Sequence, residues 1–277
     1  MTLAWIVASC LLGGVLSVLA AAAVAFRVQP SAIPVLVSYS VGALLGAAFL
    51  AVLPHAFEAG GSATALGASV LAGLMVFFVL EKLVLWRHQH APQWGEQQRH
   101  ADQPHGHAGH SHGHGHADTS HLQTGHGRGG MMILIGDTVH NFVDGVLIAA
   151  AFLADTQLGM VTALAILAHE VPSELGDFLV LLHSGYSRRQ ALIANLLSGA
   201  AMLVGGLLGY ATFNTLQGWI PSLLGFVAAS MIYVAVADLI PGLHRRPELR
   251  ATVQQVLLIG LGIATIALAT AFIGHGH

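Results

Sequence analysis

Two apolar stretches of the sequence carry polar and ionisable side chains at helical spacing. The first places four of them at positions i, i+3, i+4 and i+7, on one face of a helix: Asp137, His140, Asn141 and Asp144. The second forms two overlapping helical lines, made of Glu170, Glu174 and Asp177 and of His169, Ser173 and Asp177. Imidazole and carboxylate ligands without a thiolate suit zinc, manganese, iron, nickel or cobalt better than copper(I).

The carboxylates lie inside apolar stretches, where burying an ionisable side chain costs free energy. An ionisable side chain costs about 2.5 to 3.5 kcal/mol at the centre of a membrane helix, so it normally faces a bundle interior and marks an ion path. Carboxylates fall inside the apolar stretches, among them Asp137, Asp144, Glu170, Glu174, Asp177 and Asp238. The short connection near Asp155 predicts an antiparallel hairpin in which His140 and His169 lie about equally far from the turn, roughly 20 Å away. The two helices can therefore share an ion.

Two other readings bear on this pair of stretches. A structural salt-bridge network would need cations, and neither stretch contains Lys or Arg. A proton relay stays an alternative, although two histidines among the acids favour a metal. Pro172 cannot donate to the carbonyl of Ala168, which predicts a kink and an oxygen facing protein, water or an ion.

The composition predicts an all-α polytopic membrane protein. Of the 277 residues, 55% are hydrophobic and 8% are charged, whereas soluble domains carry charge on about a quarter of their residues. Apolar blocks of roughly twenty residues predict eight transmembrane helices: Thr2 to Phe26, Pro34 to Phe57, Thr64 to Trp86, Gly130 to Ala154, Leu158 to His183, Arg189 to Phe213, Trp219 to Leu243, and Thr252 to Ile273. Cys10 is the only cysteine, which excludes an internal disulfide and a thiolate cluster.

The cations predict the orientation of the chain. All ten Lys and Arg residues lie on or beside odd-numbered connections between the predicted spans. Because cytoplasmic loops hold the positive excess, we expect both termini outside and the long third connection inside. The compact loops favour a bacterial inner membrane. The expected partners are metal ions and the lipid bilayer, and a net charge of -3 gives no indication of nucleic acid.

Residues 88–129, between the helices of 1–87 and those of 130–277, form a predicted cytoplasmic disordered loop. Histidine, glycine and small polar residues replace Leu, Val and Ala there, so the segment cannot form a packed core. Six histidines recur within twelve positions: His105, His107, His110, His112, His114 and His116. Glycine spacers let several imidazoles gather around one ion, which favours a weak metal-capturing loop over a solubilising linker.

At the paired polar stretches the chain resembles the ZIP (Zrt/Irt-like protein) family of divalent metal transporters. It is similar to the branch with His-Asn-Phe-x-Asp-Gly on the fourth span and His-Glu-x-Pro-His-Glu-x-Gly-Asp on the fifth. The first motif is matched in full at residues 140–145, and the second at every position except Ser173, where the family has histidine. Lesser similarities lie at residues 53–56 and 233–241. The eight spans and the His-rich loop after the third also fit this family.

The resemblance implies a fold, a cargo and roles for individual residues. The fold would be a 3+2+3 arrangement with an inverted repeat, and the activity would be uptake of zinc or of Mn, Fe, Cd, Ni or Co into the cytoplasm. His140, Asp144 and His169 would hold one ion. Asn141, Asp144 and Glu170 would hold a second, with Asp144 bridging. Because a hydroxyl is a poor zinc ligand, Ser173 would weaken the first subsite unless Glu174 completes it.

The same resemblance and the predicted topology suggest a path for the ion. Glu174, Asp177 and Asp137 would form the exit, with His183 at its mouth. His55 would lie at the entrance or support a ligand, and Asp238 would be a wall residue or a helix-terminus partner. A homodimer is left open.

Two competing classes fit the chain less well. A cation diffusion facilitator has six spans and a cytoplasmic domain, and neither is predicted here. An intramembrane metallohydrolase would use a His-Glu-x-x-His helix, but Ser173 replaces the second histidine and Pro172 interrupts the helix. A zinc-dependent lipid hydrolase with scattered ligands stays an alternative.

Overall fold

The computed structural model describes residues 1–25, 33–60, 62–89, 123–213, 215, 217–244 and 248–274, and every regular element in these ranges is a helix. The first part of the chain forms α1 (Thr2–Leu11), η1 (Leu12–Leu16), α2 (Ser17–Ala25), α3 (Ile33–Ala47), η3 (Ala48–Val52), α4 (Leu53–Glu58) and α5 (Ala63–Gln89). The second part forms α6 (Gln123–Ala154), α7 (Thr156–His183), α8 (Arg188–Phe213), η5 (Gln217–Trp219), α9 (Ile220–Tyr233), η6 (Val234–Leu239), α10 (Ile240–Leu243) and α11 (Leu249–Gly274).

Long apolar segments become helices because a membrane offers no water to the backbone, and a helix satisfies its own N–H and C=O groups. Seven helical segments in the described part of the chain are long and apolar enough to cross a bilayer. The helix α7 is not among them because acids and histidines interrupt its apolar sequence, yet its 28 residues are also long enough to span. The protein is thus an all-α polytopic membrane protein, and the count of eight spans stays a prediction.

The observed helix ends differ from the predicted ones on both sides of the predicted loop. The helix α6 begins at Gln123 and not at Gly130, so residues 123–129 are helical although the composition predicts loop. Residues 88 and 89 likewise belong to α5. Apolar periodicity cannot find such extensions, because a helix that continues beyond the hydrocarbon no longer needs apolar residues.

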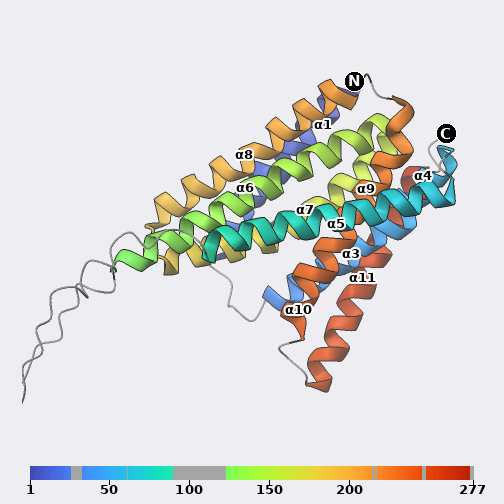
Figure 1. Cartoon of the computed structure of the whole chain (residues 1–277). Coiled ribbons are helices and arrows are strands. Elements are labelled where there is room, and N and C mark those ends of the chain that lie inside the picture. The colour runs from blue at the N-terminus through green and yellow to red at the C-terminus, as the bar shows by residue number, and fades with distance from the viewer. Residues whose placement is uncertain are drawn as a thin grey trace, which may run out of the picture.

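The helices form two groups that meet at α7 (Figure 1). In one group α1, η1 and α2 pack beside α6 and α8. In the other, α3 packs against α11, and α5 packs against α9. The helix α7 contacts α2, α3 and α6, so it joins the groups. The start of α1 and the end of α11 lie at the same end of the bundle in this view, and α6 begins at the opposite end.

Close backbone approach holds each group together. A Cβ atom added to Gly145 on α6 would overlap the carbonyl oxygen of Met202 on α8, and one added to Gly42 on α3 would overlap that of Ile259 on α11. Small residues at such crossings are the usual way in which membrane helices pack, since lipid tails provide no hydrophobic drive between them.

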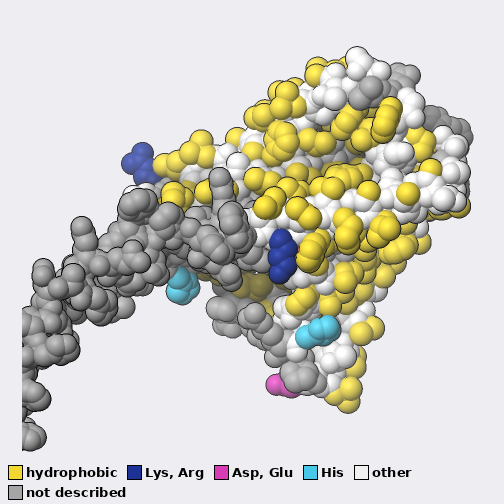
Figure 2. Space-filling model, in the orientation of Figure 1, with side chains coloured by type: hydrophobic (Ala, Val, Ile, Leu, Met, Phe, Trp, Pro, Cys, Tyr) yellow, Lys and Arg dark blue, Asp and Glu magenta, His cyan; other side chains and the backbone are white. Residues whose placement is uncertain are grey.

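The outside of the bundle is apolar. Hydrophobic side chains cover most of the face seen in Figure 2, and the few charged side chains and histidines lie toward its lower and left parts. The helices α5 and α11 are the least covered by other helices. In each of them 11% of the residues of the apolar stretch are buried, against 61% in Ile33–Glu58. Their side chains therefore form much of the surface that faces lipid.

Candidate metal centre

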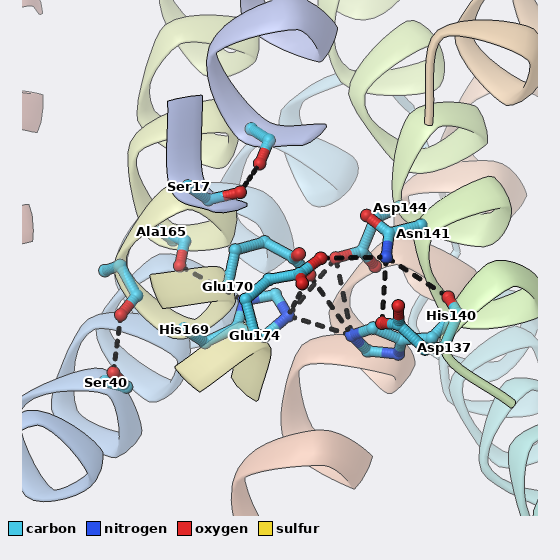
Figure 3. A network of polar contacts seen from close by, with 12 residues as sticks. Ser17, Ser40, Asp137, His140, Asn141, Asp144, Ala165, His169, Glu170 and Glu174 are labelled. Atoms are coloured by element: carbon cyan, nitrogen blue, oxygen red, sulfur yellow. Dashed lines mark hydrogen bonds and ion pairs between the residues drawn. The ribbon is translucent and has the colours of Figure 1, made fainter. Parts of the chain in front are cut away.

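Four side chains of metal-ligand type meet where α6 and α7 face each other (Figure 3). His140 and Asp144 come from α6, and His169 and Glu170 come from α7. One ligand atom of each lies within 4.8 Å of those of the other three. The Nε2 atoms of the two histidines are 3.1 Å apart. We call these residues the four-residue cluster.

The acids of the cluster face the imidazole nitrogens. Asp144 Oδ2 lies 3.2 Å from His169 Nε2 and 3.8 Å from His140 Nε2. Glu170 Oε1 lies 3.4 Å from the Nε2 atom of each histidine. Asp144, His169 and Glu170 are almost fully buried, whereas His140 is partly open to a cavity.

Several cluster oxygens lack hydrogen bonds in the described structure. They are Asp144 Oδ2 and both carboxylate oxygens of Glu170. Buried polar atoms are normally hydrogen-bonded, whereas these oxygens have at most the looser contacts with the imidazole nitrogens given above, so the arrangement needs an explanation. Four nitrogen and oxygen donors at one point suit a divalent transition-metal ion, with zinc well matched to imidazole and carboxylate.

Local hydrogen bonds on α7 fix the start of the helix and the ring of His169. Asp155 caps the helix, its Oδ1 accepting hydrogen bonds from Gln157 N at 2.8 Å and Leu158 N at 3.0 Å. Farther along, His169 Nδ1 lies 3.4 Å from the carbonyl oxygen of Ala165. That contact leaves Nε2 facing the cluster, which is the usual arrangement for a ligating histidine.

A second polar layer lies about one helical turn along α6 and α7. Asn141 Nδ2 donates to Asp137 Oδ1 at 2.9 Å and lies 3.5 Å from Glu174 Oε1. Asn195 of α8 donates to the backbone carbonyl of Glu174 at 3.3 Å. The predicted ligand Asn141 thus lies between Asp137 and another predicted ligand, Glu174, and Ser173 lies in the wall of the adjacent cavity.

This adjacent cavity has a volume of about 390 Å³. We call it the loop-side cavity, because α5 and α6 lead from it toward residues 90–122, which connect them in the sequence. Seven polar side chains line it: Glu81, Asp137, His140, Ser173, Asp177, Tyr233 and Asp238. Tyr233 donates a hydrogen bond from its hydroxyl to Glu81 Oε2. The motif spacing missed Glu81 and Tyr233, which come from α5 and α9. A carboxylate inside the third apolar block was the signal that could have found Glu81.

A second cavity, of about 330 Å³, lies at the turn between α6 and α7 and is called the terminus-side cavity. Its polar lining includes His55 and Glu58 of α4, Asp155, and Gln157 of α7. His183 lies elsewhere, exposed at the end of α7, with its Nδ1 2.7 Å from the carbonyl of Leu179. The histidines at positions 105–116 lie outside the described residues.

Comparison with known proteins identifies the family. The model of the family described as "ZIP Zinc transporter" matches residues 2–270. The chain belongs to the ZIP family. As a ZIP protein it is 36% identical to the human "Zinc transporter ZIP5", in an alignment that covers 81% of this chain and 49% of the human protein.

Two further relatives extend the likeness. The "Zinc transporter ZIP13 homolog" of Drosophila melanogaster is 29% identical, with 87% of this chain and 78% of the relative covered. "Zinc transporter YKE4" of Saccharomyces cerevisiae is 28% identical, with 84% of this chain and 69% of the relative covered. This ZIP chain thus spans about half the length of the human relative and more of the other two.

Proposed function

We propose that this ZIP protein transports a divalent transition-metal ion, zinc first, through the four-residue cluster. The observation that carries the proposal is the meeting of His140, Asp144, His169 and Glu170 at one buried point with orphaned carboxylate oxygens. The relatives' names describe zinc transporters, which supports transport over the hydrolase alternative and zinc over Mn, Fe, Cd, Ni or Co.

We propose further that the ion crosses from the terminus-side cavity to the loop-side cavity, toward the cytoplasm, in a bacterial inner membrane. His55 would receive the ion at the entrance. Three carboxylates of the loop-side cavity, Asp137, Asp177 and Asp238, would guide it out. Exposed His183 would lie at the mouth of that exit, and the histidines of positions 105–116 would capture the released ion.

Within the centre, two overlapping subsites follow from the motif positions. His140, Asp144 and His169 would hold one ion. Asn141, Asp144 and Glu170 would hold another, which requires Asn141 to exchange its contact with Asp137 for one with the ion. Glu174 and Ser173 would border these subsites, and the buried Oε2 of Glu174, which has no hydrogen bond, supports a role for Glu174 as a ligand.

Uptake of metal into proteoliposomes tests the proposal. Purified protein is reconstituted with a zinc-sensitive dye inside, and competing metals are added with zinc. We expect His140→Ala and Asp144→Ala to lose transport by roughly tenfold or more, because each removes a ligand. Matched controls are His244→Ala and Glu248→Ala, which change exposed residues outside the cluster. Wild-type rates in the two cluster variants, or no uptake by the wild type, would reject the proposal.

A further inference from the structure

The carbonyl group of Ala168 lies next to the cluster residue His169 and lacks its usual helical partner. In an α-helix this oxygen would accept a hydrogen bond from the N–H of residue 172. That residue is Pro172, which has no N–H. Inside a membrane bundle an unpartnered carbonyl is costly, so another donor has to be found nearby.

The donor is Ser40 on α3. Its hydroxyl lies 2.6 Å from the carbonyl oxygen of Ala168 and 2.9 Å from that of Leu36, one turn back on its own helix. A buried helical serine ordinarily bonds to its own i-4 carbonyl. The Ser40 hydroxyl has one proton to donate, and the shorter of its two contacts is the one with Ala168 on α7. Ser40 is fully buried, and the view in Figure 3 shows it beside the cluster.

We propose that Ser40 is a positioning residue for the metal centre. Its hydroxyl replaces the donor that Pro172 cannot supply, and so fixes the orientation of the backbone from which His169 and Glu170 reach the cluster. The proposal rests on the proposed function insofar as the cluster is the metal site. It adds a residue from outside the helix pair that bears the motifs.

The geometry explains why a small backbone rotation would matter. His169 Nε2 lies 3.2 Å from Asp144 Oδ2, and Glu170 Oε1 lies 3.4 Å from His140 Nε2. Without the Ser40 hydroxyl, the carbonyl of Ala168 has lost its donor, and the segment from Ala168 to Pro172 can turn it toward another one. Such a turn moves His169 and Glu170 together, because they follow Ala168 directly.

A double-substitution cycle tests the link, since Pro172→Ala restores an N–H that can reach Ala168. Zinc affinity of the purified protein and the KM and maximal rate of transport are measured for wild type, Ser40→Ala, Pro172→Ala and the double variant. We expect Ser40→Ala to weaken zinc binding and raise KM roughly tenfold, the usual loss when a group that orients metal ligands is removed. In the Pro172→Ala background the same change should alter both by less than about twofold.

Ser38→Ala is the matched control. Ser38 is as buried as Ser40 and lies on the same helix, but its hydroxyl donates to Pro34 within α3 at 2.6 Å. It should leave zinc affinity and KM unchanged. Equal losses from Ser40→Ala in both backgrounds, an equal loss from Ser38→Ala, or no loss from Ser40→Ala would each overturn the proposal.

Two outcomes need a separate readout. Should Ser40→Ala fail to give folded protein, the double variant must restore it, and continued misfolding would count against Ser40. If the wild type binds zinc but transports no metal, the proposed transport function is wrong. The Ser40 proposal is then still tested by the zinc affinities of the four proteins.

Discussion

Ser173 is the position at which this chain departs from its family's motif. It lines the loop-side cavity with His140, on the open side of the cluster. We expect Ser173→His to tighten zinc binding at least tenfold, because even the outer partners of a ligand are worth about 10- to 100-fold in affinity.

Zinc KM and competition by manganese and cadmium would measure this effect, with Ser173→Ala as a control that should behave as wild type. If Ser173→His changed neither affinity nor metal preference, Ser173 would not belong to the coordination shell.

Helical spacing predicted which residues of α6 and α7 would meet, since i, i+3 and i+4 positions share a face and the hairpin aligns the depths. It could not predict that Asn141 would contact Asp137, because that depends on the side-chain rotamer. Nor could it find Ser40 as the partner of Ala168, since 128 positions separate the two residues. Spacing along one helix is thus informative, whereas partners from other helices need the fold.

At the scale of the element, the start of α7 depends on the Asp155 cap. Asp155→Ala removes the acceptor for two backbone N–H groups and should lower the free energy of unfolding by about 1 kcal/mol. Asp155→Asn keeps the acceptor and should retain most of the stability. Thermal unfolding in detergent compares the two, and equal midpoints for both variants and the wild type would show that the cap is dispensable.

The close crossing of α6 and α8 requires that residue 145 be a glycine, which has no side chain. Gly145→Ala should destabilise the bundle by about 1 to 3 kcal/mol, the usual cost of overpacking, because its Cβ would overlap the carbonyl of Met202. Gly67→Ala is the matched control, since a Cβ there meets nothing within 4 Å. Monodispersity and melting temperature after solubilisation measure the effect. A Gly145→Ala protein as stable as the Gly67→Ala protein would contradict it.

Apolar block length predicted the helices to within a few residues at most ends. It did not predict the π segments η1, η3 and η6, which keep the same apolar composition as their neighbours. Proline follows two of them closely, at Pro54 and Pro241, but proline alone indicates only an interruption.

On the scale of the whole molecule, the positive charges predict which end faces the cytoplasm. Cys10 is buried and is the only cysteine, so an introduced cysteine can be labelled alone. We expect Ser62→Cys to react with a membrane-impermeant maleimide on intact cells, and Ser187→Cys to react only after permeabilisation. The reverse pattern would invert the orientation and with it the proposed direction of transport.

The histidine-rich segment should be separable from the transport path. Deletion of residues 105–116 should change local metal loading or regulation and leave the uptake rate in proteoliposomes close to that of the wild type. The physical reason is that a weak multi-site buffer raises the metal concentration nearby without forming the buried site. Loss of all uptake at normal membrane levels would place the segment in the path itself.

The π segment η6 has a consequence for how chains of this kind can vary in length. A π turn is equivalent to an α-helix with one residue inserted. Deleting one residue within Val234–Leu239 would let this π turn tighten into an α turn, and the residues that follow would keep about the same orientation relative to the preceding turns. Natural variants shorter by one amino acid here would therefore still span the bilayer, with the rest of this helix facing its neighbours as it does now.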